Sequence, residues 1–439
     1  MDMSLYSFLV VCAVFMGALC IGLPIAITLI ISSAAGIFML RGYSVMSNAL
    51  FSMPYSTGAD FGFIVVPLFI FMGHLAERSG VSEGAFKLAY RWVGGLRGGL
   101  GITTILASAI FAATSGSSVA TSATVGRIAL KEMRRYRYSD VISSGTVGAG
   151  GLLGIMIPPS TMMVIYGLVT QVDIIKLFVA GILPGLLTTF IFSFGLYIVA
   201  LFRPDLMPTA KVNFTFREKL TGLKDGWGIM VLFSVLMVGI YGGFFTVTEA
   251  AAAGVATAAI LLFIRKGFAW RDLFYGGKQA AKSTAMIFFI LIGAGVFGRY
   301  VALSGLANDL SEWLVALEVS RWWVLIAIIV VYIPLGTFLE PISMVLITMP
   351  IIFPVIVKLG FDPVWFGILI VKVCELANIS PPVGVNIFVI RSVDRTIPLS
   401  VIFKGTFLFM VLEIITLALL VAFPEISLFL VDRMWAPAN

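Results

Sequence analysis

The sequence predicts an all-α, polytopic membrane protein built as an inverted-topology repeat. Of its 439 residues, 60% are hydrophobic and only 12% are charged, whereas a soluble protein carries about 25% charged residues. Apolar runs recur along the chain, and each is near the roughly 20 residues that cross a bilayer as a helix. Two Pro-Pro pairs also interrupt apolar segments that otherwise read as helices. A membrane β-barrel would instead show alternating segments of about ten residues.

The formal net charge of +7 arises from Lys and Arg spread over short loops between apolar runs. This distribution fits the basic excess of cytoplasmic loops better than a nucleic-acid surface. We therefore expect contact with membrane lipid and no nucleic-acid partner. The apolar N-terminal stretch has no basic segment before it, so no cleavable signal peptide is expected. His74 is the single histidine, and it predicts neither a transition-metal site nor a catalytic one.

The two Pro-Pro pairs begin at Pro158 and Pro381, and 381 − 158 = 223 residues separate them. The same offset of 223 relates Thr114 and Thr337, each in the middle of a long broken segment. A constant offset indicates two homologous halves. The predicted first repeat, cytoplasmic linker and second repeat are residues 1–210, 211–224 and 225–439.

Each half is expected to contain spans, an amphipathic stretch, a long segment broken at its centre, a Pro-Pro helix and a last span. The long broken segments, at about 98–135 and 320–358, are interpreted as re-entrant helical hairpins. The Pro-Pro helices are expected at about 139–171 and 363–392. Proline breaks a helix because it lacks the N–H donor and clashes with the carbonyl four residues earlier.

The charges predict that the two halves have opposite orientations. Basic residues such as Arg97 and Arg135 flank both ends of the first hairpin, which places its ends in the cytoplasm. The acidic residues Asp309 and Glu312 precede the second hairpin, which is therefore expected to enter from outside. An inverted repeat with discontinuous helices is typical of secondary transporters.

A hairpin tip beside a Pro-Pro break predicts a Na⁺ site without a fixed charge. The free carbonyls of a broken helix, with Ser and Thr hydroxyls, can replace the water around Na⁺, and free N–H ends attract carboxylates. Kinks that merely allow close packing are the simpler explanation of one break, but four matched breaks favour two or more ion sites. The predicted sodium-binding residues are Thr114, Ser115, Gly116, Ser117, Ser118, Ile157, Pro158, Ser160, Gly336, Thr337, Phe338, Leu339, Ser380, Pro381, Val383 and Gly384. The predicted substrate contacts are Ser118, Ser160, Thr161, Glu340 and Asn386.

Several charged residues lie within or near the spans. Lys372 and Glu375 are three residues apart and can pair on one helix face, either as a structural ion pair or as a coupling site. Glu340 is a candidate for substrate or ion contact, with a local hydrogen bond as the alternative. Glu249 is expected to be a structural cap near the outer surface.

Several segments resemble the large membrane subunit of tripartite ATP-independent periplasmic (TRAP) transporters. They include "SGSSVATSATVGRIALKEM", "GLLGIMIPPSTMMVIYG" and "ISPPVGVNIFVI", and the resemblance covers nearly the whole chain. It implies a multi-pass subunit of the bacterial inner membrane with both hairpins in a moving elevator domain. It also implies Na⁺-coupled import of an organic acid, such as a C4-dicarboxylate or sialic acid. The implied partners are a small four-helix membrane subunit and a periplasmic substrate-binding protein.

Other functions remain open at this point. The main alternative is a self-sufficient Na⁺/carboxylate symporter that needs no binding protein. An intramembrane enzyme is disfavoured, because the sequence lacks HExxH and GxSxG motifs. A proton antiporter is expected to have buried paired carboxylates, and the sequence indicates none. A channel is possible in principle, but two broken hairpins suit alternating access better.

Overall fold

The computed structural model describes residues 3–435 except 211, 213, 317 and 318, and these residues form helices with no strand among them. The first half contains α1 (Met3–Cys20), α2 (Ile25–Ala59), the 3-10 helix η1 (Phe61–Ile64), α3 (Val65–Ser79), α4 (Val81–Val93), α5 (Gly99–Ser115), α6 (Ser118–Arg135), α7 (Asp140–Met156), α8 (Thr161–Thr170) and α9 (Ile174–Phe202). The second half contains α10 (Phe216–Tyr241), α11 (Val247–Lys266), α12 (Trp270–Ser304), α13 (Leu306–Ala316), α14 (Arg321–Phe338), α15 (Pro341–Lys358), α16 (Pro363–Ile379), α17 (Val385–Val393), α18 (Leu399–Ala422) and α19 (Glu425–Met434).

The helices of the described residues confirm the predicted membrane protein. Nine single spans among them are long and apolar enough to cross a bilayer, and α7 with α8 forms one further, bent span. The two hairpins are α5 with α6 and α14 with α15, and the broken helices are α7 with α8 and α16 with α17. Each break falls where the sequence predicts it.

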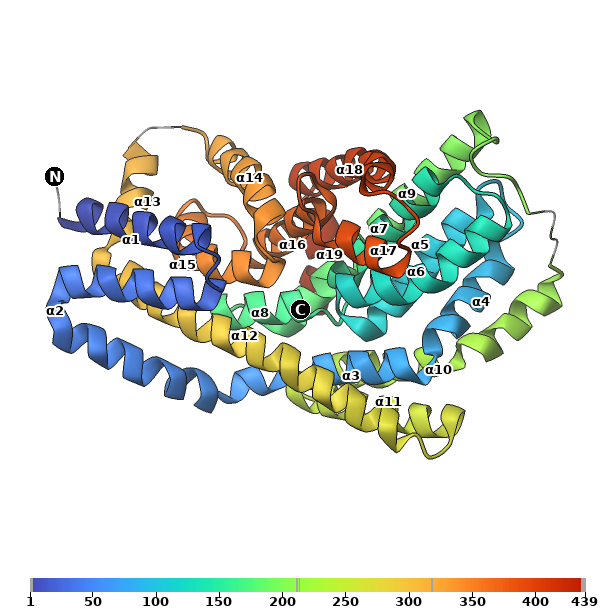
Figure 1. The fold of residues 1–439 in the computed structure, drawn as a ribbon, viewed down its shortest axis with the longest axis horizontal. Helices are drawn as coiled ribbons and strands as arrows, with labels where there is room; N and C mark the ends of the chain where they lie inside the picture. The colour runs from blue at the N-terminus through green and yellow to red at the C-terminus, as the bar shows by residue number, and fades with distance from the viewer. Residues whose placement is uncertain (1–2, 211, 213, 317–318, 436–439) are drawn as a thin grey trace.

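The two halves contain the same order of helices up to α9 and α18, and one pair of helix contacts occurs in both. By position along each half, α2 corresponds to α11 and α3 corresponds to α12. Helix α12 packs along α2, and α11 packs along α3, so the same contact occurs twice. In Figure 1 the hairpins lie towards opposite ends of the molecule, with the broken helices between them and α12 running beneath. This arrangement fits an inverted repeat, while the repeat boundaries stay a prediction.

Two capping boxes start the first helices of the second half. In each, a threonine side chain accepts the N–H of a glutamate three residues on, and the glutamate accepts the N–H of the threonine. The first pair, Thr215 and Glu218, starts α10 inside the predicted linker, so residues 216–224 are helical. The second pair, Thr246 and Glu249, starts α11. This confirms that Glu249 is a structural cap.

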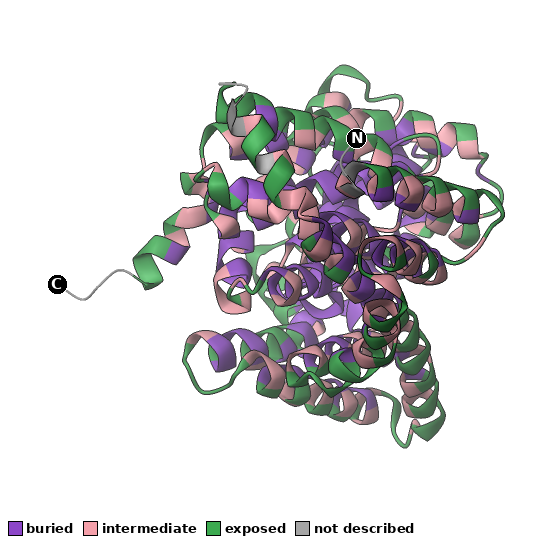
Figure 2. Cartoon of the chain, turned by 90° about the vertical axis from the view of Figure 1, so that its left-hand side faces the viewer, coloured by how far each residue is buried: buried purple, intermediate pink, exposed green. Residues whose placement is uncertain are grey.

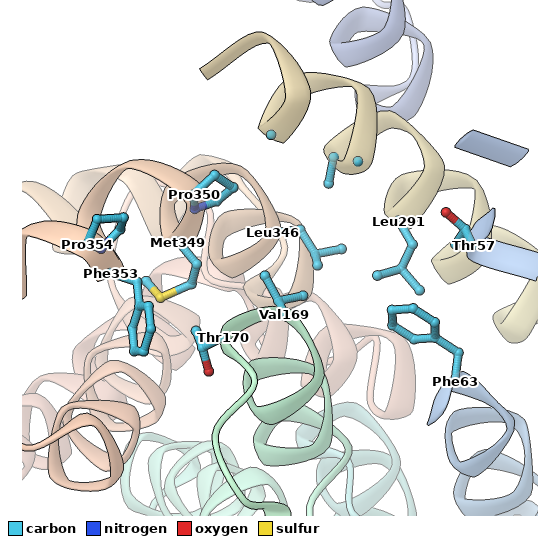
Figure 3. Close-up of a pocket in the computed structure, with 13 residues that line it drawn as sticks. Thr57, Phe63, Val169, Thr170, Leu291, Leu346, Met349, Pro350, Phe353 and Pro354 are labelled. Carbon is cyan, nitrogen blue, oxygen red and sulfur yellow. The ribbon is translucent and has the colours of Figure 1, made fainter. Parts of the chain in front are cut away.

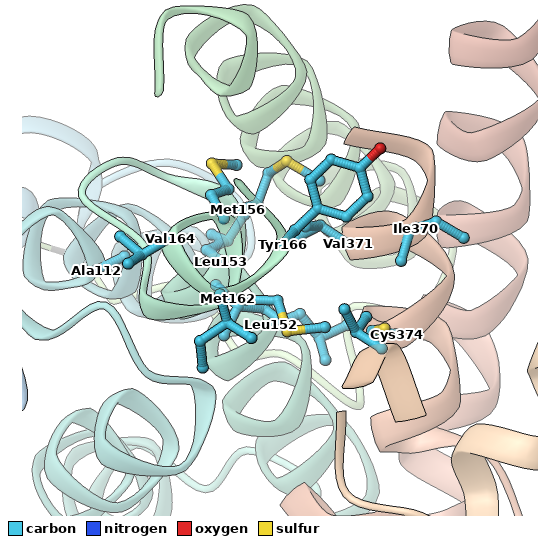
Figure 4. Close-up of a cluster of buried hydrophobic side chains, with 14 of the residues drawn as sticks. Ala112, Leu152, Leu153, Met156, Met162, Val164, Tyr166, Ile370, Val371 and Cys374 are labelled. Atoms are coloured by element: carbon cyan, nitrogen blue, oxygen red, sulfur yellow. The ribbon is translucent and has the colours of Figure 1, made fainter. Parts of the chain in front are cut away.

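The core lies where the hairpins meet the broken helices. Figure 4 shows Ala112 of α5, Leu152 and Met156 of α7, Tyr166 of α8 and Ile370 of α16 in one apolar cluster. Their close packing fixes both broken helices against the first hairpin. Figure 2 shows the buried residues at the centre of the molecule, with exposed residues on the outer helices. Many of these exposed side chains are large and apolar, as expected for surfaces that face lipid.

Candidate ion and substrate site

The first hairpin tip lies between α5 and α6, at Gly116 and Ser117. Gly116 has φ 59°, a left-handed conformation that glycine adopts without steric cost. Ser117 caps α6, because its Oγ accepts the N–H of Ala120 at 3.4 Å. Next to it, Oγ of Ser115 lies 2.8 Å from Oγ1 of Thr121. The tip therefore holds several hydroxyl groups and a helix N-terminus within the protein.

The first break lies between α7 and α8, which are bent by 41°. The Pro158–Pro159 peptide bond is cis. Because neither proline has an N–H, the carbonyls of Gly154 and Ile155 lose their helical donors. Ser160 replaces one of them, since its Oγ donates to the Ile155 carbonyl at 2.6 Å and also caps α8.

The first tip and the first break are in direct contact. We call this contact the first junction, which comprises residues 114–118 and 157–160. The carbonyl of Gly116 accepts two hydrogen bonds from Thr161, one from the N–H at 3.4 Å and one from Oγ1 at 2.7 Å. A Cβ atom at Gly116 would lie 2.9 Å from the Pro159 carbonyl oxygen, and one at Gly154 would lie 2.4 Å from that of Ser117. The backbones therefore approach so closely that only glycine fits at both positions.

The second hairpin tip lies between α14 and α15, at Leu339 and Glu340. The carboxylate of Glu340 caps α15 by accepting the N–H of Ser343 at 3.3 Å. The local hydrogen-bonding role considered for Glu340 is thus present in the structure. The hydroxyl of Thr337 donates to the Pro334 carbonyl of its own helix at 2.7 Å. That hydroxyl oxygen retains lone pairs that can accept a cation.

The second break lies between α16 and α17 and again contains a cis peptide bond, Pro381–Pro382. The hydroxyl of Ser380 donates to the Leu376 carbonyl at 2.6 Å. Gly384 has φ 60°, and a Cβ atom there would lie 3.1 Å from the Ser380 carbonyl oxygen. The chain therefore turns tightly here, with carbonyl groups on the inside of the turn.

The second tip packs against α16, the helix that leads into the second break. We call this region the second junction, which comprises residues 336–340 and 380–384. A Cβ atom at Gly336 would lie 2.6 Å from Cβ of Ala377, one turn before the break. Phe338, Pro381 and Pro382 are exposed, whereas the prolines of the first break are buried. The structure thus places all predicted sodium-site residues on two junctions, and ion binding there stays a prediction.

Two buried asparagines lie near the second break with unused hydrogen-bonding capacity. The side-chain amide of Asn378 has no partner for either polar atom among the described residues. Asn386 donates from Nδ2 to the Gly148 carbonyl at 3.5 Å. Its Oδ1 has no hydrogen-bond partner among the described residues. A Cβ atom at Gly151 would meet both Nδ2 of Asn386 and Oγ of Ser122. Asn386, predicted as a substrate contact, therefore lies where α6, α7 and α17 converge, and sequence reasoning missed Asn378.

Lys372 and Glu375 form the predicted ion pair, with 2.7 Å between Nζ and Oε2. The structure adds Glu413 of α18, whose Oε1 lies 2.7 Å from the same Nζ. All three side chains are fully buried. The expectation that the chain has no buried paired carboxylates is therefore wrong. The second carboxylate comes from another helix, and nothing in the local sequence pattern links the two.

Two cavities lie beside the hairpins, between them and the long helices. One, of about 550 Å³, is lined by charged side chains of α3, α6 and α11, including Glu77, Arg127 and Lys266. Arg127 of the first hairpin forms an ion pair with Glu77 of α3 at 2.8 Å. The other cavity, of about 400 Å³, is mostly apolar, and Figure 3 shows Leu291 of α12 and Met349 of α15 in its wall. The two hairpins thus face cavities of contrasting polarity.

The fold and the paired junctions define the class of the protein: a multi-pass helical protein with the discontinuous helices of a secondary transporter. Residues 12–426 match the family model described as the tripartite ATP-independent periplasmic transporter, DctM component, and the chain belongs to this family. The members of this family are permease subunits of bacterial transporters, and the described helices include nine apolar spans. The chain is therefore a multi-pass protein of the bacterial inner membrane.

Named relatives agree with this assignment, and a solved structure has a similar fold. The chain is 35% identical to the C4-dicarboxylate TRAP transporter large permease protein DctM of Pseudomonas aeruginosa, over 91% of this chain and 92% of the relative. It is 30% identical to the sialic acid TRAP transporter large permease protein SiaM of Vibrio cholerae, over 95% and 96% respectively. These relatives are transporter permease subunits and not enzymes. The fold is similar to the YdaH transporter of Alcanivorax borkumensis, with a TM-score of 0.62 at 14% identity and 90% coverage of both chains.

Proposed function

We propose that this chain is the large permease subunit of a transporter that imports an organic acid together with Na⁺ by elevator-type alternating access. The observation that supports Na⁺ coupling most directly is that the first hairpin tip contacts its Pro-Pro break and the second tip packs against the helix that leads into its own break. At both junctions, carbonyl and hydroxyl oxygens gather where the helical hydrogen bonds are interrupted. Oxygen ligands of this kind suit Na⁺, because oriented carbonyls supply the field that a fixed charge would otherwise provide.

The N-termini of the half-helices support the substrate site. Ser118 and Thr161 are the first residues of α6 and α8, and both lie beside the first junction. Their helix N-termini attract a carboxylate through free N–H groups and the positive end of the helix dipole. Asn386 adds a buried amide oxygen and Glu340 a carboxylate near the second junction. A substrate carboxylate between the two tips would therefore meet N–H donors of the first half, while Asn386 and Glu340 of the second half would offer oxygen acceptors to other polar groups of the substrate.

The two cavities support alternating access. The charged cavity lies between the first hairpin and helices α3 and α12, and the apolar cavity lies between the second hairpin and α12. Movement of the hairpins along these helices would open one cavity and close the other. The Arg127–Glu77 ion pair joins a hairpin to α3 and would have to separate or move in that step.

The substrate and the partners follow from family membership. The named relatives transport a C4-dicarboxylate and sialic acid, so an organic acid of this kind is the proposed substrate. The family description names a tripartite, periplasmic system, and we propose the corresponding partners: a small four-helix membrane subunit and a periplasmic substrate-binding protein. The exposed apolar faces of the outer helices leave room for a membrane partner as well as lipid.

Uptake into proteoliposomes tests this proposal. The full chain is reconstituted with the small subunit, and the loaded binding protein is supplied outside with a panel of radiolabelled organic acids. Uptake should require an inward Na⁺ gradient and should stop without the binding protein. Uptake that ignores Na⁺ and follows a proton gradient would refute the coupling. Robust uptake by the isolated chain would instead establish a self-sufficient symporter.

A further inference from the structure

The group formed by Lys372, Glu375, Glu413 and Thr188 is closed to solvent. We call these four side chains the buried charge cluster. Lys372 and Glu375 come from α16, Glu413 from α18 and Thr188 from α9, and each side chain is fully buried. Nζ of Lys372 lies 2.7 Å from an oxygen of each carboxylate and 2.8 Å from Oγ1 of Thr188. The ammonium thus donates hydrogen bonds to Glu375 and Thr188 and forms an ion pair with Glu413.

The charges within this group do not balance. Two ionised carboxylates and one ammonium would leave one net negative charge in a dry interior, which is strongly unfavourable. Cys374 also interacts with Glu375, and it is not a cation. No second basic residue interacts with Glu375 among the described residues. The excess charge therefore has no basic partner.

Hydrogen bonding shows the same deficit. Oε1 of Glu375 and both carboxylate oxygens of Glu413 are buried and accept no hydrogen bond among the described residues. Oε2 of Glu375 and Oε1 of Glu413 each lie 2.7 Å from Nζ of Lys372. These two oxygens therefore lie no farther apart than twice 2.7 Å. A proton on one carboxyl group would provide a donor in this confined space and would also cancel the excess charge. A further metal ion is not required, because one proton meets both needs.

We propose that Glu375 and Glu413 together bind one proton at neutral pH, held beside the ammonium of Lys372. The group then has one carboxylic acid, one carboxylate and one ammonium, and it is electrically neutral. It joins α16, which leads into the second break, to α9 and α18. This proton site is separate from the sodium sites proposed above, and its test does not depend on transport.

Infrared spectroscopy of the purified full chain in lipid nanodiscs tests the proton directly. The wild-type protein at pH 7 should show a carboxylic-acid C=O band that disappears in Glu375→Gln and equally in Glu413→Gln. Either variant leaves one carboxylate for one ammonium, so the remaining group ionises. Lys372→Met should enlarge the band, because both carboxyl groups are then protonated. Glu425→Gln, at an exposed position of α19, is the control and should leave the band unchanged.

Melting temperatures provide an independent readout. Each single Glu→Gln variant should melt close to the wild type, because a neutral amide replaces a neutral acid. The double variant Glu375→Gln/Glu413→Gln should melt about 5–10 °C lower, since Lys372 then lacks any counter-charge. A band unaffected by both single variants would overturn the proposal. So would single variants as unstable as the double variant. If the single variants fail to fold, the absence of any alkali-sensitive carboxylic-acid band in the wild type would overturn it equally.

Discussion

The two junctions have the same parts but differ in how firmly tip and break are joined. In the first junction, Thr161 donates two hydrogen bonds to the Gly116 carbonyl, and the prolines of the break are buried. Beside the second junction, Gly336 of the tip packs against the apolar Ala377 of α16, and the prolines of the break are exposed. The two repeats thus form one junction that hydrogen bonds hold together and one, the looser junction, where the tip packs through apolar contact. The looser junction is the natural candidate for the part that opens to admit substrate.

The largest expected effect concerns the close backbone contact in the first junction. Gly116→Ala combines a left-handed backbone with a Cβ atom placed against the Pro159 carbonyl, and it should cost about 3 kcal/mol of stability. Gly384→Ala has a similar φ but meets the end of the Ile387 side chain first, so it should cost about 1–2 kcal/mol. Thermal unfolding of the purified variants measures both.

A third glycine isolates the backbone contribution. Gly22 has φ 81°, and a Cβ atom there would meet no atom within 4 Å. Gly22→Ala should therefore show only the cost of the left-handed conformation. If Gly116→Ala were no worse than Gly22→Ala, the first junction would not be the tightly packed one.

The next effect concerns Na⁺ itself and tests whether both junctions bind it. Ser117→Ala and Thr337→Ala each remove one neutral oxygen ligand, at a cost of about 1–3 kcal/mol. The Na⁺ concentration for half-maximal uptake should rise about tenfold in each variant, since about 1.4 kcal/mol corresponds to a factor of ten. Proteoliposome uptake measured against Na⁺ concentration decides this. A change in only one variant would restrict Na⁺ binding to that junction.

The smallest expected effect concerns the hydrogen bonds that lock the first junction. Thr161→Val removes the hydroxyl that donates to Gly116 and should lower stability by about 1 kcal/mol, whereas Thr161→Ser should restore most of it. Thr337→Val should change stability less, because that hydroxyl bonds only within its own helix. Melting temperatures in Na⁺-free buffer compare the three variants. Equal losses at Thr161 and Thr337 would contradict the difference between the junctions.

The sequence was sufficient to predict the hairpins, the breaks and their pairing, because Pro-Pro pairs and small polar residues interrupt helices locally. The early start of α10 was also readable, since Thr215 and Glu218 have the spacing of a capping box. Contacts between distant helices were not readable. The approach of Glu413 to Lys372 depends on how α18 packs against α16, and the lock by Thr161 depends on the register between tip and break. No local pattern encodes either.

The first junction contains no ionisable side chain among residues 114–118 and 157–160. Under the proposed elevator mechanism, this has an electrical consequence. An empty first junction would cross the membrane without moving a charge of its own, so the membrane potential would act mainly on the cations and the anion that occupy the carrier. About 2.3 kcal/mol per elementary charge is available at 100 mV. The voltage would therefore drive the loaded step, and the return of the empty carrier would be nearly insensitive to it at this junction.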